Sequence, residues 1–213
     1  MRTLIPFAAV NPTTRLDSVL TADERAAFAR AMLRSVCATL QQAGSEPTVL
    51  STAALEATAL PADTSVVVDD RPLTAAVNDE LTTDTPTLIM MADLPLATPE
   101  SIRRLIAASD DAGTDADVAI APGLGGGTNA LVVRAPAFRV DYHGASYLDH
   151  RAAAADLGAT VETVDSRRLA TDIDEPSDLA EVLIHGDGPA REWLIDAGFE
   201  LDRSDGRVGV RRR

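Results

Sequence analysis

The sequence predicts one α/β domain over residues 1–213, with a mainly parallel, mixed sheet and helices on both faces. Three observations predict this fold. The length of 213 residues suits a single domain with a full-sized core. Short apolar runs alternate with stretches of helical periodicity along nearly the whole chain, and no internal repeat interrupts them. Strands that are separated by helices pair in parallel, and the connecting helices then cover both faces of the sheet.

The expected elements follow from apolar periodicity and from helix caps. Strands are expected at residues 3–10, 47–51, 65–69, 87–92, 118–121, 129–133 and 160–164. Helices are expected at residues 21–43, at 73–81, from 98 onward, at 146–157 and at 177–184. Thr21 and Glu24 have the spacing of a capping box, and Thr98 precedes a proline at the first helical position. The continuous apolar run at 87–92 indicates a strand that is buried on both faces.

Residues 188–213 have a different pattern and are expected to form an appendage. Residues 188–197 have a helical pattern, and strands at 199–202 and 207–210 are expected to form a hairpin around Ser204, Asp205 and Gly206. Such an appendage could close an edge of the sheet or pair with a second subunit.

Composition and charge exclude several classes of protein. The net charge is −14 and lysine is absent, so no basic face can neutralise a run of nucleic-acid phosphates. No apolar run approaches the roughly 20 residues of a membrane span. The first residues lack the pattern of a secretory leader, and Cys37, the single cysteine, cannot form an internal disulfide. We therefore expect a cytoplasmic protein with no nucleic-acid or membrane partner.

The absence of lysine has two explanations. Exchange of lysine for arginine follows from a GC-rich genome alone. Together with the excess of Asp over Glu and the abundance of Thr and Ala, it also resembles proteins of a salt-loaded cytoplasm. There, hydrated carboxylates keep the surface soluble, and salt screens their mutual repulsion.

Two acidic corners are the best candidates for chemistry. Asp93 follows the strand at 87–92, and ligands of open α/β sheets gather at the carboxyl ends of strands. Asp172 and Asp174 are two residues apart, so an extended backbone directs both carboxylates to the same side. Mg²⁺ would stabilise both charged forms while keeping water and substrate phosphates as its other ligands. The alternatives are a turn aspartate at position 93 and a pair that caps the helix beginning near Pro176.

A glycine-rich stretch between the acidic corners could bind an anion. It is no Walker loop, because that loop needs a lysine, and its spacing does not fit the dinucleotide fingerprint. Amides around Gly127 could form an anion nest, to which Thr128 and Asn129 add side-chain donors. Ser146 opens an expected helix, where an anion would meet backbone amides; an N-cap serine is the alternative. Along the chain, candidate metal ligands are followed by a candidate anion-binding loop and then by further candidate metal ligands. This order suggests transfer of a nucleotidyl group.

The remaining candidates are one arginine and the histidines. Arg15 is the only cation in the loop after the first expected strand, where it could handle a triphosphate or lie on the surface. His143, His150 and His185 show no zinc-binding pattern. His150 follows Ser146 by four residues, on the same expected helix face, and is interpreted as a structural residue or one at the edge of a substrate.

These motifs, in this order and spacing, resemble those of the 2-phospho-L-lactate guanylyltransferases, a family of deazaflavin coenzyme biosynthesis. The resemblance covers nearly the whole chain to about Gly188. It is carried by Ile5-Pro6, Thr14 to Leu16, Thr21 to Arg25, Met32-Leu33, Met91 to Leu96, Gly126 to Leu131, Gly144 to Ser146 with His150, and Asp172 to Leu179.

The resemblance implies a nucleotidyltransferase fold of the glycosyltransferase-A type, that of the nucleotide-diphospho-sugar transferases. It implies that GTP condenses with 2-phospho-L-lactate to give lactyl diphosphoguanosine and pyrophosphate, a step in coenzyme F-420 biosynthesis. Bacterial relatives use phosphoenolpyruvate as the acceptor. The family also suggests a homodimer, with residues 188–213 at its possible interface.

Site residues are carried over by motif. The resemblance implies that Asp93, Asp172 and Asp174 hold Mg²⁺ and that Arg15 steadies the triphosphate. The acceptor's phosphate and carboxylate would be contacted by a second group of residues, comprising Thr128 and Ser146 with Gly127 and Asn129.

Three departures from the family pattern bear on the nucleotide. Lysines that are common in the family are missing at Ala8 or Ala9 and at Thr13, so triphosphate binding relies more on Arg15 and the metal. A Gly-Leu-Asn run on the nucleotide side reads Pro-Leu-Thr here, with Thr74 as the expected nucleotide contact. A histidine, residue 143, stands where glycine is common.

Two alternatives to this family remain open. Molybdopterin and sugar nucleotidyltransferases usually carry a Leu-Ala-Gly-Gly signature after the first strand, whereas residues 7–12 read Phe-Ala-Ala-Val-Asn-Pro here. A nucleotide-binding regulator that kept the fold without turnover would account for the missing lysines.

Overall fold

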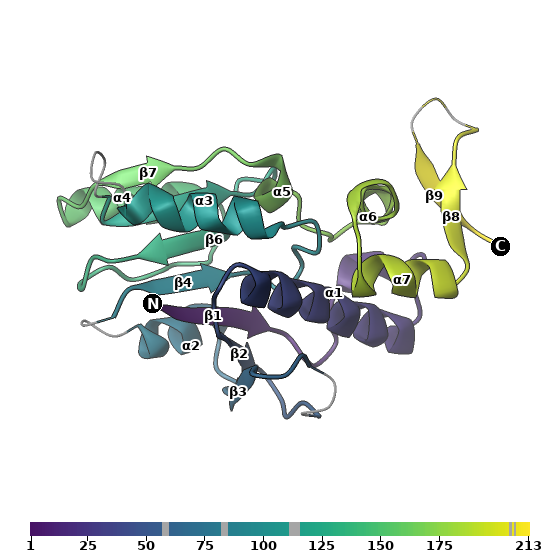
Figure 1. The fold of residues 1–213 in the computed structure, drawn as a ribbon, viewed down its shortest axis with the longest axis horizontal. Helices are drawn as coiled ribbons and strands as arrows, with labels where there is room; N and C mark the ends of the chain where they lie inside the picture. The colour runs from purple at the N-terminus through teal and green to yellow at the C-terminus, as the bar shows by residue number, and fades with distance from the viewer. Residues whose placement is uncertain (57–59, 82–84, 111–115, 205, 207) are drawn as a thin grey trace.

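The protein, seen in a computed structural model, is described over residues 1–56, 60–81, 85–110, 116–204, 206 and 208–213. Within these residues, seven strands form a main sheet in the order β3-β2-β1-β4-β6-β5-β7 (Figure 1). Those strands are β1 (Arg2–Phe7), β2 (Pro47–Ser51), β3 (Ser65–Val68), β4 (Thr87–Met90), β5 (Val118–Pro122), β6 (Thr128–Val133) and β7 (Val161–Thr163). The predicted α/β fold with a mixed sheet is confirmed.

One strand makes the sheet mixed. The pairs β1–β2, β1–β4, β2–β3 and β5–β7 are parallel, whereas β6 is antiparallel to both β4 and β5. The first residue of β6 therefore lies at the edge where its neighbours end. The strand order reverses at β1, because β2 and β3 lie on one side of it and β4 lies on the other. Ligands of such sheets bind outside the carboxyl ends of the strands at this switch point.

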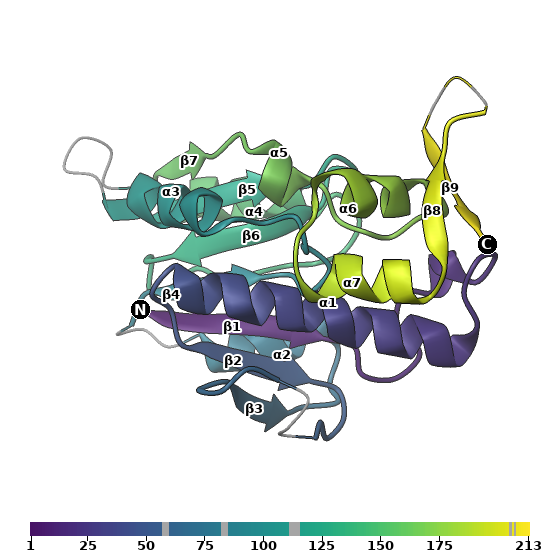
Figure 2. The same ribbon diagram turned by 45° about the vertical axis from the view of Figure 1, so that its right-hand side comes forward.

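Helices cover both faces of the sheet, as predicted (Figure 2). One face packs against α1 (Ala22–Gln42), α3 (Pro99–Asp110) and α5 (Arg167–Ala170). The other face packs against α2 (Leu73–Glu80) and α4 (Ser146–Asp156). The capping box at the start of α1 is formed by Thr21 and Glu24, and the amide of Ser101 donates to the Thr98 hydroxyl at the start of α3. Local capping chemistry thus fixes where both helices begin.

The C-terminal part packs on the far side of α1. It comprises η3 (Pro176–Asp178), α6 (Leu179–His185), α7 (Pro189–Asp196) and a hairpin of β8 (Phe199–Asp202) and β9 (Gly209–Arg212). Phe28 and Met32 of α1 share a third buried cluster with Leu194 of α7 and Phe199 of β8. In the described residues the hairpin pairs only with itself, so the expectation that it could close an edge of the main sheet is wrong.

Three local expectations need correction. β1 ends at Phe7 rather than at residue 10, because beyond it the amide of Ala9 donates to the side chain of Thr52 instead of to the backbone of a neighbouring strand. The single turn α5 was not expected, because four residues are too few to show a helical period. The last strand begins two residues later than expected, while Asp205 and Arg207 of the expected hairpin lie outside the described residues. None of the described helices has the length and apolar character that a membrane span requires.

Glu24 links the start of α1 to the end of the chain. Its carboxylate accepts a hydrogen bond of 2.9 Å from the Thr21 amide and another from the guanidinium of Arg212 in β9. These donors, Arg212 first, lower the pKa of Glu24 from 4.5 to about 2. The folded state therefore binds the Glu24 proton less tightly than the unfolded state does.

We expect Glu24→Gln to lower the thermal midpoint slightly at pH 7, because Gln keeps the cap but loses the charge that pairs with Arg212. The difference from the wild type should be present above pH 4.5 and disappear as the pH falls towards 2. Melting curves at low salt from pH 2 to 7 measure it, with Arg212→Gln as the matched control. A difference that is constant with pH would contradict the role of the ion pair.

Candidate active site

The acidic corners predicted from the sequence meet at the edge where β1 and β4 end. Asp93 follows β4 by three residues, and its backbone carbonyl accepts a hydrogen bond of 3.0 Å from the amide of Ile173. Ile173 is completely buried in the cluster beneath α6 and α7. The side chains on either side of it, Asp172 and Asp174, are therefore held beside Asp93.

Asp93 carries the most perturbed carboxylate of this group. The residue is partly exposed, but its Oδ1 atom is buried and has no hydrogen-bond partner within the described part of the chain. Burial first, and then the negative charges of Asp174 and Asp172, raise the pKa of Asp93 from 3.8 to about 7 against the opposing effect of Arg15. A buried, unpaired carboxylate beside two others is a functional-site signal, because such an arrangement is costly without a cation.

Two neighbouring side chains hold the Asp172–Asp174 pair. Arg15, in the short helix η1 (Thr14–Leu16), pairs with Asp174 at 2.9 Å between Nη1 and Oδ2. The side-chain amide of Asn129 donates to Asp172 at 3.2 Å and to the carbonyl of Leu169 at 2.9 Å. Burial raises the pKa of Asp174 and Arg15 opposes that shift. Arg15 is thus an exposed arginine that pairs with one carboxylate of the site, and Asn129 contacts another.

The donor set fits a divalent cation that shares its coordination with a substrate. In the described residues, no group of three or more His, Cys, Asp or Glu side chains forms a ready metal-binding cluster. Mg²⁺ does not require such a cage, because it usually keeps several waters and is bound through one or two carboxylates and substrate phosphates. The partnerless Oδ1 of Asp93, beside two carboxylates of like charge, is the atom that such an ion would satisfy.

A pocket of about 260 Å³ opens beside these carboxylates at the switch point of the sheet. Asp93 and Asp174 line one part of it. Its apolar walls come from the strand ends and from α1 and α2, and include Phe7, Ala29, Met32, Leu50, Leu73, Ala76 and Met91. Apolar walls with a few charged groups at one side are typical of a site for a small molecule that has a flat apolar part and an anionic part.

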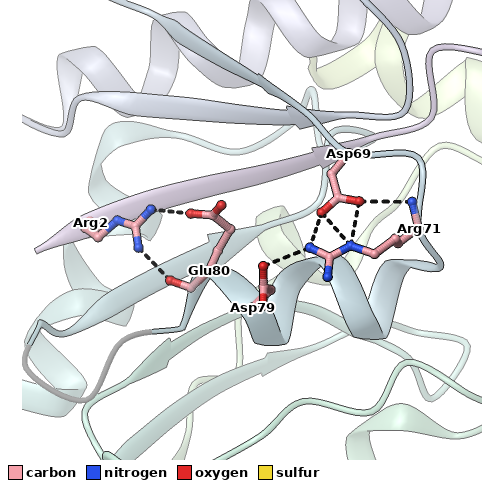
Figure 3. Close-up of polar contacts among 5 residues, drawn as sticks. All are labelled: Arg2, Asp69, Arg71, Asp79 and Glu80. Carbon is pink, nitrogen blue, oxygen red and sulfur yellow. Dashed lines mark hydrogen bonds and ion pairs between the residues drawn. The ribbon is translucent and has the colours of Figure 1, made fainter.

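Asp69 and Arg71 also line this pocket, and sequence reasoning missed them. Figure 3 shows the Arg71 guanidinium between Asp69 and Asp79 of α2. Its Nη2 atom lies 2.5 Å from Oδ2 of Asp69 and 2.9 Å from Oδ2 of Asp79. In the same view Arg2 ties the start of β1 to Glu80 at the end of α2. Asp69 directly follows β3, so the strand-end rule that selected Asp93 could have found it.

Thr74, the expected nucleotide contact, is engaged with the protein. Its hydroxyl accepts a hydrogen bond of 3.0 Å from the amide of Tyr142, which joins α2 to the segment before α4. The neighbouring Leu73 lines the pocket, whereas Thr74 does not.

The glycine-rich loop is closed largely on itself. The amides of Gly123, Leu124 and Gly126 donate to the carbonyls of Gly127, Ala170 and Gly123, so these three amides are not available to an anion. The loop nevertheless brings Thr128 against Ser146. The hydroxyl oxygen of Ser146 accepts a hydrogen bond of 2.9 Å from the amide of Thr128. Ser146 is the first residue of α4, and its side chain does not cap that helix.

A β-bulge at the start of β6 sets the direction of Asn129. Ala121 pairs with Ala130 and Pro122 pairs with Thr128, so Asn129 has no partner in β5, while its carbonyl accepts the amide of Met91 after β4. In regular alternation Asn129 would lie on the α4 face with Leu131 and Val133, but its amide reaches Leu169 of α5 on the opposite face. Bulges commonly redirect side chains next to active sites, and this one delivers Asn129 to Asp172.

Solved structures place the fold among the nucleotidyltransferases. A chain from Desulfovibrio desulfuricans G20, described as a nucleotide-diphospho-sugar transferase, superposes with a TM-score of 0.73 at 14% identity, covering 92% of this chain and 95% of that one. A 2-C-methyl-D-erythritol 4-phosphate cytidylyltransferase from Thermus thermophilus superposes with a TM-score of 0.52 at 17% identity, covering 86% and 98%. The fold is thus that of the nucleotide-diphospho-sugar transferases.

Sequence comparison identifies the family more closely. The family described as guanylyl transferase CofC like matches residues 1–213. The 2-phospho-L-lactate guanylyltransferase of Natronomonas pharaonis is 56% identical over 213 residues and is covered completely, as is this chain. The one from Methanocorpusculum labreanum is 47% identical, over 98% of this chain and 95% of that protein. The chain belongs to the CofC-like guanylyl transferase family, and its lysine-free, acidic composition is of the halophilic archaeal type.

We expect Gly123→Ala to disturb the site without unfolding the protein. A Cβ at position 123 would lie 2.5 Å from Oδ1 of Asn129, so the Asn129 side chain must move away from Asp172. Turnover should fall about tenfold or more, because one charge-assisted hydrogen bond at the site is lost. Gly125→Ala is the matched control, since a Cβ there meets nothing within 4 Å. Equal activity of the two variants would contradict the role of Asn129.

We expect Asp93→Asn to stabilise the protein in the absence of a divalent cation. The pKa of Asp93 is raised from 3.8 to about 7 on folding, so the protonated side chain stabilises the folded protein. This stabilisation is fully present below pH 4 and is lost as the pH rises through 7. The amide variant removes this loss. Thermal melts in EDTA from pH 4 to 8 measure both proteins, and parallel curves would rule out the raised pKa.

Proposed function

We propose that this chain transfers the guanylyl group of GTP to 2-phospho-L-lactate, giving lactyl diphosphoguanosine and pyrophosphate in coenzyme F-420 biosynthesis. The match of the whole chain to the CofC-like family and the names of its relatives support this proposal. The observation that carries it is the meeting of Asp93 with Asp172, Asp174 and Arg15 beside an apolar pocket at the switch point. Phosphoenolpyruvate is the alternative acceptor, because it offers the same phosphate and carboxylate.

Mg²⁺ would be held through one or two of the carboxylates of Asp93, Asp172 and Asp174, and when bound it would neutralise charge on the phosphates of GTP. Arg15, paired with Asp174, can turn its remaining donors towards the triphosphate. The apolar pocket would take the base and ribose, with Thr74 holding α2 in place behind it.

The acceptor would lie against the start of β6 and of α4. Thr128 and Ser146 are bonded to each other there, and Gly127 precedes them in the loop. We propose that they contact the phosphate and carboxylate of the acceptor, while Asn129 acts through Asp172. With these contacts, the acceptor would lie between the loop and the carboxylates.

A phosphate oxygen of the acceptor would attack the α-phosphorus of GTP in line. The new P–O bond forms as the bond to the β-phosphate oxygen breaks, and pyrophosphate leaves. Phosphate is already ionised at neutral pH, so the step needs no general base. The protein contributes position and charge neutralisation, which account for most of the rate enhancement in phosphoryl-transfer chemistry of this kind.

The pyrophosphate-release assay that tests this proposal crosses four NTPs with both acceptors, in molar potassium chloride with and without Mg²⁺. We expect release only with GTP, Mg²⁺ and one of the acceptors. Asp93→Ala should lower turnover by about three orders of magnitude or more, with the fold intact by circular dichroism. Near-normal activity in that variant would remove Asp93 from the mechanism. GTP binding without release would favour a regulator, and release with a sugar or pterin phosphate would favour the other nucleotidyltransferases.

We also propose a homodimer that uses the C-terminal helix and hairpin of residues 188–213. In the described residues, β8 and β9 pair only with each other, so their outer edges pair with no strand of the main sheet. Such edges could pair with a second subunit, and this supports a dimer interface at the hairpin. Light scattering of the intact protein tests the dimer. A monomer at micromolar concentration in molar salt would contradict it.

A further inference from the structure

His150 of α4 is completely buried between two polar partners. Its Nδ1 atom lies 2.8 Å from the hydroxyl oxygen of Thr128, and its Nε2 atom lies 2.9 Å from the amide nitrogen of Asp141. Two rings enclose the imidazole, Tyr142 edge-on at 5.1 Å and Phe138 tilted at 6.0 Å between centroids. Each ring nitrogen of His150 therefore has one hydrogen-bond partner within the protein.

The two partners determine where the imidazole carries its proton. A backbone amide can only donate, so the Asp141 N–H requires a lone pair on Nε2. A neutral imidazole has one N–H, which must then be on Nδ1 and must donate to the Thr128 hydroxyl oxygen. Burial keeps the ring neutral, since it lowers the pKa of His150 to about 4.

This tautomer makes the Thr128 hydroxyl a donor towards other groups. A hydroxyl has one proton, and the oxygen of Thr128 already accepts from His150. The oxygen of the Ser146 hydroxyl likewise accepts a hydrogen bond, from the amide of Thr128, and its proton is left to donate. Among the residues that the structure describes, no acceptor takes either hydroxyl proton. Thr128 and Ser146 are each 4% exposed, whereas His150 has no exposure, so the imidazole itself is closed to a ligand.

We propose that His150 is a positioning residue, which fixes the Thr128 hydroxyl as a hydrogen-bond donor to an oxygen of the anionic acceptor substrate. This inference rests on the proposed function for the identity of that substrate. It excludes His150 as a general base, because Nε2 is occupied by the Asp141 amide and Nδ1 carries a proton. The acceptor subsite thus recognises an anion by two hydroxyl donors rather than by lysine.

The kinetic test compares substitutions at the two ends of the His150–Thr128 hydrogen bond. His150→Phe keeps a ring but removes both nitrogens, and we expect it to raise the KM for the acceptor about tenfold while the KM for GTP is unchanged. Thr128→Val should give the same rise, and the double variant should add nothing to it. Thr128→Ser and His150→Asn, which keep the hydroxyl and a donor near Nδ1, should recover most of the affinity.

A purely structural role for His150 would give a different result. It would raise the KM of both substrates alike, or the effects of His150→Phe and Thr128→Val would multiply, and either outcome overturns the inference. An unchanged acceptor KM in His150→Phe also overturns it. Wild-type protein that shows no acceptor-dependent pyrophosphate release would instead overturn the proposed function.

A spectroscopic test needs no turnover. Long-range proton–nitrogen correlation spectra of protein labelled with ¹⁵N in histidine distinguish a protonated from a bare ring nitrogen. The spin system that disappears in His150→Asn identifies the residue. We expect Nδ1 protonated and Nε2 bare at neutral pH in folded wild-type protein. The opposite tautomer, or a doubly protonated ring, would overturn the inference whatever the enzyme's activity.

Discussion

The hydrogen bond from the Ile173 amide to the Asp93 carbonyl is the contact on which the rest of the site depends. It joins two segments that lie far apart in the sequence and anchors them through Ile173, which is completely buried. With Ile173 fixed, Asp172 and Asp174 must face the same solvent-accessible corner as Asp93. The backbone thus brings together like charges that would separate if side chains alone decided their position.

Holding these carboxylates together costs stability that the protein recovers only in part. Arg15 and Asn129 each pair with one of them, while Oδ1 of Asp93 has no partner in the described residues. Strain of this kind at a functional site is commonly offset by binding. Under the proposed function, a chain without lysine would bind its anionic substrates through arginine, the metal and neutral donors. The hydroxyls of Thr128 and Ser146 are the neutral donors that we propose.

The start of β6 serves both parts of the site. Thr128 is coupled through its hydroxyl to α4, and Asn129 is coupled through its amide to Asp172. The bulge opposite Pro122 makes this possible, because Asn129 has no partner in β5 and its side chain turns to the α5 face. One reversed strand therefore connects α4 to the carboxylates of the site.

Apolar periodicity, capping residues and strand ends are local properties, so they were enough to predict the fold class, most element boundaries and the acidic corners. What those residues contact depends on how the chain folds in three dimensions. Alternation along β6 would have sent Asn129 to the wrong face, and no local pattern marks the bulge that redirects it. The pairing of His150 with Thr128, and of Arg15 with Asp174, likewise depends on chain folding between distant segments. Such contacts are set by packing of the whole core, which sequence spacing does not encode.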